Sequence, residues 1–107
     1  MADFREDFEG KTVIVTGAAS GLGKATALGF GNAGAKVVVA DKKVEEGKEV
    51  CSELKGMGTE SIFVETDVTS EDSVKNMIDT TLKTFDVLDI LINNAGTGVP
   101  HLVQPCT

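Results

Sequence analysis

The sequence predicts an α/β fold in which a doubly wound parallel sheet, with strand order 3-2-1-4, lies between two layers of helices. Short apolar, β-branched runs alternate with longer segments of helical periodicity, from a first strand through to a fourth. The apolar runs are continuous, which is typical of strands buried on both faces of a parallel sheet. The first run ends in a turn with three glycines, directly before a helical segment.

The composition is that of a small acidic globular domain. The chain has 107 residues, of which 41% are hydrophobic, so we expect one domain over residues 1–107 with a single modest core. The 10 basic and 17 acidic residues give a net charge of −7, which disfavours nucleic acids and anionic membranes as partners. Any phosphate ligand must therefore be held by local dipoles.

The sequence shows no pattern typical of targeting or of metal binding. Residues 1–10 are charged and lack the apolar core of a signal peptide, and no apolar run reaches membrane-spanning length, so we expect a cytoplasmic protein. Cys51 and Cys106 lack metal-ligand spacing and fit a reducing compartment. His101, the single histidine, is expected to be a surface residue.

The first predicted strand is Thr12–Thr16, and Phe8 before it is a candidate apolar anchor under the sheet. A helix is expected over Gly21–Asn32. Helical spacing predicts one buried face for it, made of Leu22, Thr26, Phe30 and Ala33. Gly29 and Gly31 each cost this helix roughly 1 kcal/mol against alanine, and we interpret them as sites where the helix packs closely on the strand.

The second predicted strand is Lys36–Ala40, which ends at Asp41, and a helix is expected from Val44 to about Lys55. Three residues share the inner face of this helix: Val44, Cys51 and Leu54. Cys51 is therefore interpreted as a core thiol. The third predicted strand is Ser61–Glu65.

A capping box predicts the start of the third helix, because Thr69 is followed three residues later by Asp72. The helix is expected to reach Phe85, and Asp89–Asn93 is the fourth predicted strand. An apolar stripe at helical spacing predicts the buried face: Val74, Met77, Ile78, Thr81, Leu82 and Phe85.

Right-handed crossovers place the fourth strand beside the first, on the side away from the second. The gap between strands one and four is a topological switch point, where ligands bind at the carboxyl ends of the strands. Two segments reach that edge: the glycine turn from Gly17 to Gly23, and the sequence Asn94-Ala95-Gly96.

The glycine turn has the chemistry of an anion site. The first N–H groups of a helix have no acceptor inside it, and the helix dipole adds about half a positive charge there. Glycines let the chain turn sharply and let a diphosphate approach the backbone. We expect the diphosphate to be surrounded by Gly17, Ser20, Gly21, Leu22 and Gly23.

Asp41, at the end of the second strand, is a candidate acceptor for both hydroxyls of an adenosine ribose. The same carboxylate repels a 2′-phosphate, and Ser20 adds no positive charge, so the sequence favours NAD over NADP. Lys42 and Lys43 argue for NADP, because either could meet a phosphate. The alternative interpretation is that Asp41 is only a turn residue.

Asp67 and Val68 follow the third strand, beside the expected adenine pocket. The Asp67 carboxylate could accept a hydrogen bond from the adenine amino group, while Val68 offers backbone groups and an apolar wall. Equally, Asp67 could help to cap the helix that starts near Thr69. The residues alone leave both interpretations of Asp67 open.

Three motifs resemble those of the short-chain dehydrogenase/reductase family. Residues 16–23 match its T-G-x-x-x-G-x-G turn, Asp67-Val68 looks like its adenine-pocket pair, and residues 93–96 match its N-N-A-G motif. The wide first glycine gap also argues against a methyltransferase. The resemblance spans about residues 8–96 and implies the amino-terminal, NAD(P)-binding part of a Rossmann fold, ending after its fourth strand.

The resemblance also implies roles for single residues. Asp41 would select NAD, and Asn94, Ala95 and Gly96 would border the adenosine ribose, whereas Asn93 would tie the fourth strand to its neighbours. Catalysis in the family uses a serine after a fifth strand and a Tyr-x-x-x-Lys pair. The chain contains no tyrosine, and every serine precedes the fourth strand, so no catalytic residue is assigned.

Two functions of different classes follow. In the first, the chain is the cofactor-binding portion of an oxidoreductase that moves hydride between a nicotinamide and an alcohol or ketone, and is inactive alone. In the second, it is a non-catalytic NAD-binding or interaction module. We also expect self-association, because the apolar fourth strand is a sheet edge and one helix covers the second face.

Overall fold

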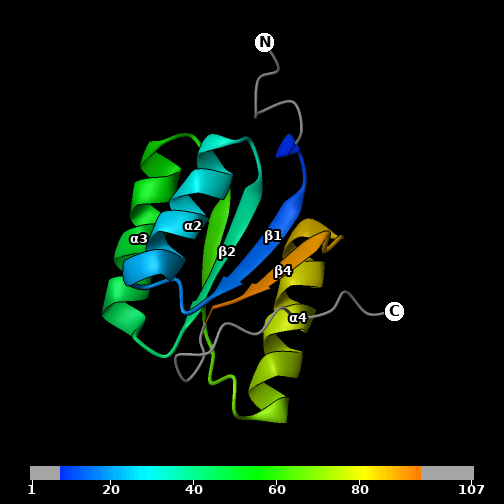
Figure 1. Ribbon diagram of the computed structural model, residues 1–107. Helices are drawn as coiled ribbons and strands as arrows, with labels where there is room; N and C mark the ends of the chain where they lie inside the picture. The colour runs from blue at the N-terminus through cyan, green and yellow to red at the C-terminus, as the bar shows by residue number, and fades with distance from the viewer. Residues whose placement is uncertain (1–7, 95–107) are drawn as a thin grey trace.

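The computed structural model describes residues 8–94 and confirms the predicted α/β fold. The sheet is parallel throughout and has the order β3-β2-β1-β4 (Figure 1). Along the chain the elements are β1 (Thr12–Thr16), α2 (Gly21–Asn32), β2 (Lys36–Asp41), α3 (Val44–Gly56), β3 (Ser61–Glu65), α4 (Glu71–Phe85) and β4 (Ile90–Asn93). Every predicted element is present, with its bounds shifted by no more than a residue or two.

Burial on both faces explains the continuous apolar runs of β1 and β2. All five residues of β1 are buried, and so are the four inner positions of β2. The two strands pair in register from Thr12 opposite Lys36 to Thr16 opposite Ala40. The register aligns the carboxyl ends of these strands at one edge, where the glycine turn leaves β1.

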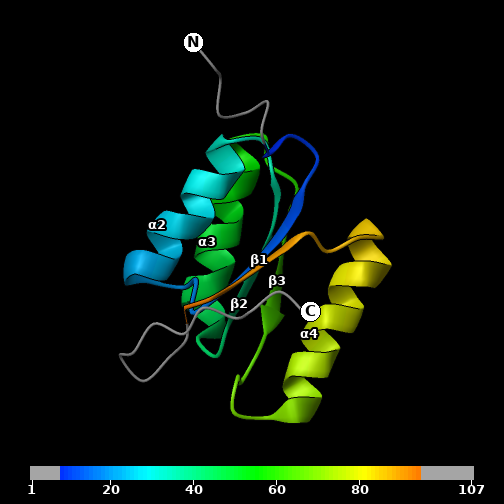
Figure 2. The same ribbon diagram turned by 45° about the vertical axis from the view of Figure 1, so that its right-hand side comes forward.

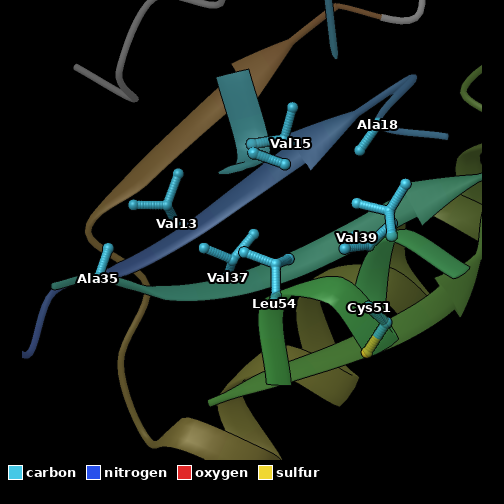
Figure 3. Close-up of a cluster of buried hydrophobic side chains, with 10 residues drawn as sticks. Val13, Val15, Ala18, Ala35, Val37, Val39, Cys51 and Leu54 are labelled. Atoms are coloured by element: carbon cyan, nitrogen blue, oxygen red, sulfur yellow. The ribbon is translucent and has the colours of Figure 1, made fainter. Parts of the chain in front are cut away.

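Helices cover both faces of the sheet: α2 and α3 lie on one side and α4 on the other (Figure 2). The core between the sheet and α2/α3 is built mainly from small and branched side chains (Figure 3): Val13, Val15, Ala18, Ala27, Ala35, Val37, Val39, Val50, Cys51 and Leu54. The smaller core under α4 contains Ile14, Val38, Ala40, Val64 and Met77. Cys51 is thus a core thiol, as predicted.

The predicted buried face of α2 is wrong in part. The buried residues are Gly23, Ala27 and Gly31, whereas Leu22 is 73% exposed. Three small residues at four-residue spacing let the helix backbone approach its neighbours closely, so the larger side chains are displaced to the flanks. One of them, Phe30, packs edge-on against Phe8, with ring centroids 5.2 Å apart, which confirms Phe8 as an anchor.

Of the two glycines in the second half of α2, Gly29 and Gly31, only Gly31 is a close-packing site. A Cβ on Gly31 would collide with the Leu54 side chain and would lie 3.0 Å from Thr59 Oγ1, so Gly31 packs against α3 and its exit instead of the strand. A Cβ on Gly29 would meet nothing within 4 Å. The prediction that Gly29 serves close packing is therefore wrong.

The start of α4 lies one residue later than the capping box predicts. The N-cap is Ser70, whose Oγ accepts a hydrogen bond from the Ser73 N–H at 3.2 Å. Thr69 does not cap, because both its N–H and its hydroxyl donate to Asp67. Of the predicted stripe, Met77 is 1% exposed, but Leu82 is 40% exposed and faces away from the core.

Residues 8–94 contain no helix that is both long and apolar enough to span a membrane. Within the same range, no group of three or more His, Cys, Asp or Glu side chains is placed to hold a metal ion. The predictions for Ala95, Gly96, His101 and Cys106 lie outside the described residues.

Candidate dinucleotide site

The glycine turn lies where β1 meets α2, at the carboxyl edge of the sheet (Figure 1). Gly17 has φ 65° and Gly21 has φ 59°, a left-handed conformation in which side chains are strained. The backbone therefore strongly favours glycine at both positions.

The amino end of α2 is left open toward solvent. Ser20 is the N-cap, but its hydroxyl makes no capping hydrogen bond, and the first turn carries no acidic residue. The N–H groups of Gly21, Leu22 and Gly23 have no acceptor inside the helix. A Cβ on Gly21 would meet nothing within 4 Å, so there is free space beside these donors. The donors, the dipole and the space fit an anion such as a diphosphate.

The third glycine joins the turn to β4. A Cβ on Gly23 would collide with the carbonyl oxygen of Gly17 and would lie 2.7 Å from Asn94 Nδ2. No side chain fits between these groups. Gly23 therefore lets the first turn of α2 rest directly on the start of the glycine turn and beside Asn94.

A buried threonine holds the end of β4 in place. Thr16 Oγ1 donates to Asn93 Oδ1 at 2.8 Å and accepts a hydrogen bond from the Asn94 N–H at 2.9 Å. The prediction that Asn93 ties β4 to its neighbour is confirmed. The network fixes Asn94 at the switch point between β1 and β4.

Asp41 lies half-buried at the end of β2 and bonds to backbone on two sides. Its Oδ2 accepts from the Ala19 N–H at 2.9 Å, and its Oδ1 accepts from the Lys43 N–H at 2.9 Å. The turn-residue interpretation of Asp41 therefore describes part of what it does. A carboxylate has about four lone-pair sites, so these two bonds leave acceptor capacity for a ribose diol.

The Asp67 carboxylate stabilises the turn just before α4 and bonds no N–H group of the helix itself. Its Oδ1 accepts from the Thr69 N–H at 2.9 Å and from Thr69 Oγ1 at 2.6 Å. The Thr69 hydroxyl, followed by the Thr69 N–H and a weaker attraction from Lys42, lowers the pKa of the Asp67 carboxyl below its usual 3.8. The Asp67 N–H in turn donates to Ser73 Oγ at 2.8 Å.

A cavity of about 620 Å³ lies beside Asp67, between the end of β3 and α4. Its lining is mainly polar and includes Lys42, Thr66, Ser73 and Asn76. Val68, the predicted apolar wall of the adenine pocket, is half-buried and does not line this cavity. The structure thus brings Asp41, Asp67 and the glycine turn to one edge of the sheet and leaves the role of Val68 a prediction.

Sequence reasoning missed two contributors to the site. Ala19 contributes a backbone N–H to Asp41, and Thr16 contributes its hydroxyl to β4. The first could not be predicted, because nearly every residue has a backbone N–H and the residue type does not show which of them bonds Asp41. The polar Thr16 at the end of an apolar strand was a usable signal for the second.

The family model described as short chain dehydrogenase matches residues 11–106. The chain belongs to the short-chain dehydrogenase family. Members are oxidoreductases that typically bind NAD or NADP, and the described chain has the parallel Rossmann-type arrangement of their amino-terminal part.

Known proteins match nearly all of this chain but only part of their own length. An uncharacterized oxidoreductase of Thermotoga maritima is 44% identical over 95 residues, which are 89% of this chain and 37% of that protein. Secoisolariciresinol dehydrogenase of Forsythia intermedia is 45% identical over 94 residues, 87% of this chain and 33% of its own. The chain thus spans about a third of the length of these curated relatives.

Solved structures give the same picture. A hydroxysteroid dehydrogenase from Escherichia coli superposes with a TM-score of 0.85 at 35% identity, over 92% of this chain and 42% of that one. A short chain dehydrogenase from Mycobacterium avium gives a TM-score of 0.80 at 36% identity, over 83% of this chain and 34% of its own.

Proposed function

We propose that this chain is the NAD-binding portion of a short-chain dehydrogenase that transfers hydride between a nicotinamide and an alcohol or ketone. The observation that carries the proposal is the junction of β1 and α2. Two left-handed glycines, an uncapped helix start and a third glycine with no room for a side chain form a cradle for a diphosphate. The carboxylate at the end of β2 stands beside it.

The cradle sets how the cofactor would bind. The N–H groups of the first turn of α2 would hold the diphosphate, and Asp41 would accept the hydroxyls of the adenosine ribose. Asn94 borders the same gap, and Ala95 and Gly96 are assigned to the ribose by the family motif alone. Adenine would lie toward Asp67 and Val68. The nicotinamide supplies the hydride chemistry once NAD is bound.

A preference for NAD over NADP follows from the charge at the end of β2. The Asp41 carboxylate would face the 2′-position of the ribose, where a phosphate would be repelled. Lys42 and Lys43 are both exposed and could offset part of that repulsion. We expect the carboxylate to dominate, because two backbone N–H groups hold it in place.

Fluorescence or calorimetric titration with NADH and NADPH tests the proposal. We expect NADH to bind at least tenfold more tightly than NADPH. Asp41→Ala should weaken NADH at least tenfold, since charge-assisted hydrogen bonds contribute about 1.5–3 kcal/mol each. Glu49→Ala, which removes the same charge from an exposed position of α3 that does not line the cavity beside Asp67, is the control. Failure of both cofactors to bind the folded chain contradicts the proposal.

We further propose that the 107-residue chain has no dehydrogenase turnover by itself. The family's catalytic acid–base group is a tyrosine, and this chain has none. General acid–base catalysis typically contributes 10²–10⁴-fold, and that share is lost here. Turnover with NAD and a panel of secondary alcohols, at a rate within tenfold of a full-length relative, would refute this.

The second candidate function is a non-catalytic NAD-binding or interaction module that associates through the open side of the sheet. The supporting observation is apolar surface around β4: Ile90, Leu91 and Ile92 are only half-buried, while Leu82 and Val87 are 40% and 44% exposed. Light scattering over a concentration series should show association. If the chain is instead a monodisperse monomer that binds NADH, the interaction role is excluded and only the NAD-binding role remains.

A further inference from the structure

The glycine turn is attached to β2 by two consecutive N–H groups. The Ala18 N–H donates to the Ala40 carbonyl at 3.4 Å, which extends the β1–β2 ladder by one bond. The next N–H, that of Ala19, donates to the side chain of Asp41 at 2.9 Å. The Asp41 carbonyl is directed to the other side of β2, where it accepts from the Thr66 N–H just after β3 at 3.0 Å. The carboxylate therefore adds to the β1–β2 pairing a bond between the turn and β2 that a backbone carbonyl does not supply.

The geometry of this attachment is fixed from both ends. The Lys43 N–H bonds Asp41 Oδ1 and so orients the carboxylate toward the turn. Ala19 is only 5% exposed, which leaves its N–H little access to water as a substitute partner. Ala19 also lies midway between the left-handed Gly17 and Gly21. The bond thus holds the middle of the turn, while Gly23 rests against the Gly17 carbonyl and beside Asn94.

We propose that Asp41 is a positioning residue for the diphosphate as well as a partner of the ribose. By holding the Ala19 N–H, it keeps the turn in the shape in which the N–H groups at the start of α2 converge on one anion. This inference rests on the proposed function, because it assumes that the diphosphate binds at that turn. Its consequence is specific: loss of Asp41 weakens even a ligand that carries two phosphates and no ribose.

The test compares inorganic pyrophosphate with NADH on four proteins by ¹⁵N NMR. The proteins are the wild-type chain, Asp41→Ala, Asp41→Asn and the charge-matched control Glu49→Ala. We expect Asp41→Ala to lower the protection of the Ala19 N–H from solvent exchange at least tenfold and to weaken pyrophosphate about fivefold or more. Asp41→Asn keeps one acceptor oxygen for two donors, so it should fall between the wild type and Asp41→Ala. The control should match the wild type in both measurements.

The outcomes separate this inference from the function on which it rests. Suppose that Asp41→Ala loses NADH affinity but keeps the wild-type affinity for pyrophosphate and the wild-type protection of the Ala19 N–H from exchange. Asp41 then contacts only the ribose, and the inference is overturned. If the wild-type chain binds neither ligand, the proposed function fails first. Should Asp41→Ala not fold, Asp41→Asn decides: unchanged Ala19 protection and pyrophosphate affinity in that variant also overturn the inference.

Discussion

Replacement of Gly23 by alanine is the sharpest perturbation that the structure offers. The added Cβ would collide with the Gly17 carbonyl, a backbone group that cannot rotate away, and would lie 2.7 Å from Asn94 Nδ2. Overpacking of this kind costs roughly 1–3 kcal/mol, and we take the upper end because the obstacle is backbone. The higher helix propensity of alanine offsets about 1 kcal/mol of this loss in the free energy of unfolding. The net loss is about 2 kcal/mol, or roughly 8–16 °C in Tm for a domain of this size.

Gly29→Ala in the same helix is the matched control. Its Cβ would meet nothing within 4 Å, so only the propensity gain of about 1 kcal/mol remains, and Tm should rise by roughly 4–8 °C. Thermal unfolding followed by circular dichroism measures both variants, and NADH titration should show at least a tenfold weaker affinity for Gly23→Ala alone. Equal Tm shifts in the two variants would refute the assigned contact between the turn, α2 and β4.

Three further predictions concern the polar network around the site. Thr16→Val removes the hydroxyl that pairs with Asn93 at the end of β4 and with the N–H of Asn94 just after it, and should cost about 1–3 kcal/mol in denaturant unfolding. Ser70→Ala removes the N-cap of α4 and should cost about 1 kcal/mol, measured the same way. In an NMR titration the Asp67 pKa should lie below 3.8 and rise toward it in Thr69→Val. Because the folded-state pKa is lowered, this pair stabilises the fold fully above pH 3.8 and progressively less as pH falls through the folded-state value.

The order of elements and the sheet topology were predictable because each rests on strong local signals. The run Val37-Val38-Val39 favours a strand wherever it lies, and its lack of alternation indicates burial on both faces. Right-handed crossovers and the doubly wound pattern then favour the order 3-2-1-4, which the sheet has. The glycine turn was predictable for a similar reason, because a left-handed backbone at Gly17 and Gly21 tolerates few other residues.

Packing details were less predictable because they depend on neighbours far along the chain. The buried face of α2 is chosen by how closely the helix approaches α3, so Gly31 is buried and Leu22 is exposed. Hydrophobicity alone favours the opposite. The N-cap of α4 is Ser70 instead of the predicted Thr69, because the Thr69 hydroxyl is bonded to Asp67. Several Ser, Thr and Asp residues in succession offer more than one candidate cap, so the sequence alone does not select between them.

The second role of Asp41, as the acceptor for a backbone N–H of the turn, could not be predicted from the sequence for a related reason. The residue type at the end of β2 predicts a ribose acceptor, but its bond to the Ala19 N–H depends on how β1 and β2 align. The register places the turn beside that carboxylate. Only the assembled sheet shows that Asp41, which is expected to bind the ribose of the cofactor, also holds the glycine turn that would bind the diphosphate.

The most direct test of the account is an amide NMR titration of the chain with NADH. We predict saturable shifts concentrated at Gly21, Leu22, Gly23 and Asp41, where the first turn of α2 meets the end of β2. A second cavity of about 480 Å³, lined in part by Gly34 and Gly58, lies at the opposite edge of the sheet and should be silent. Shifts that cluster there, or none at the glycine turn at saturating NADH, would contradict the account.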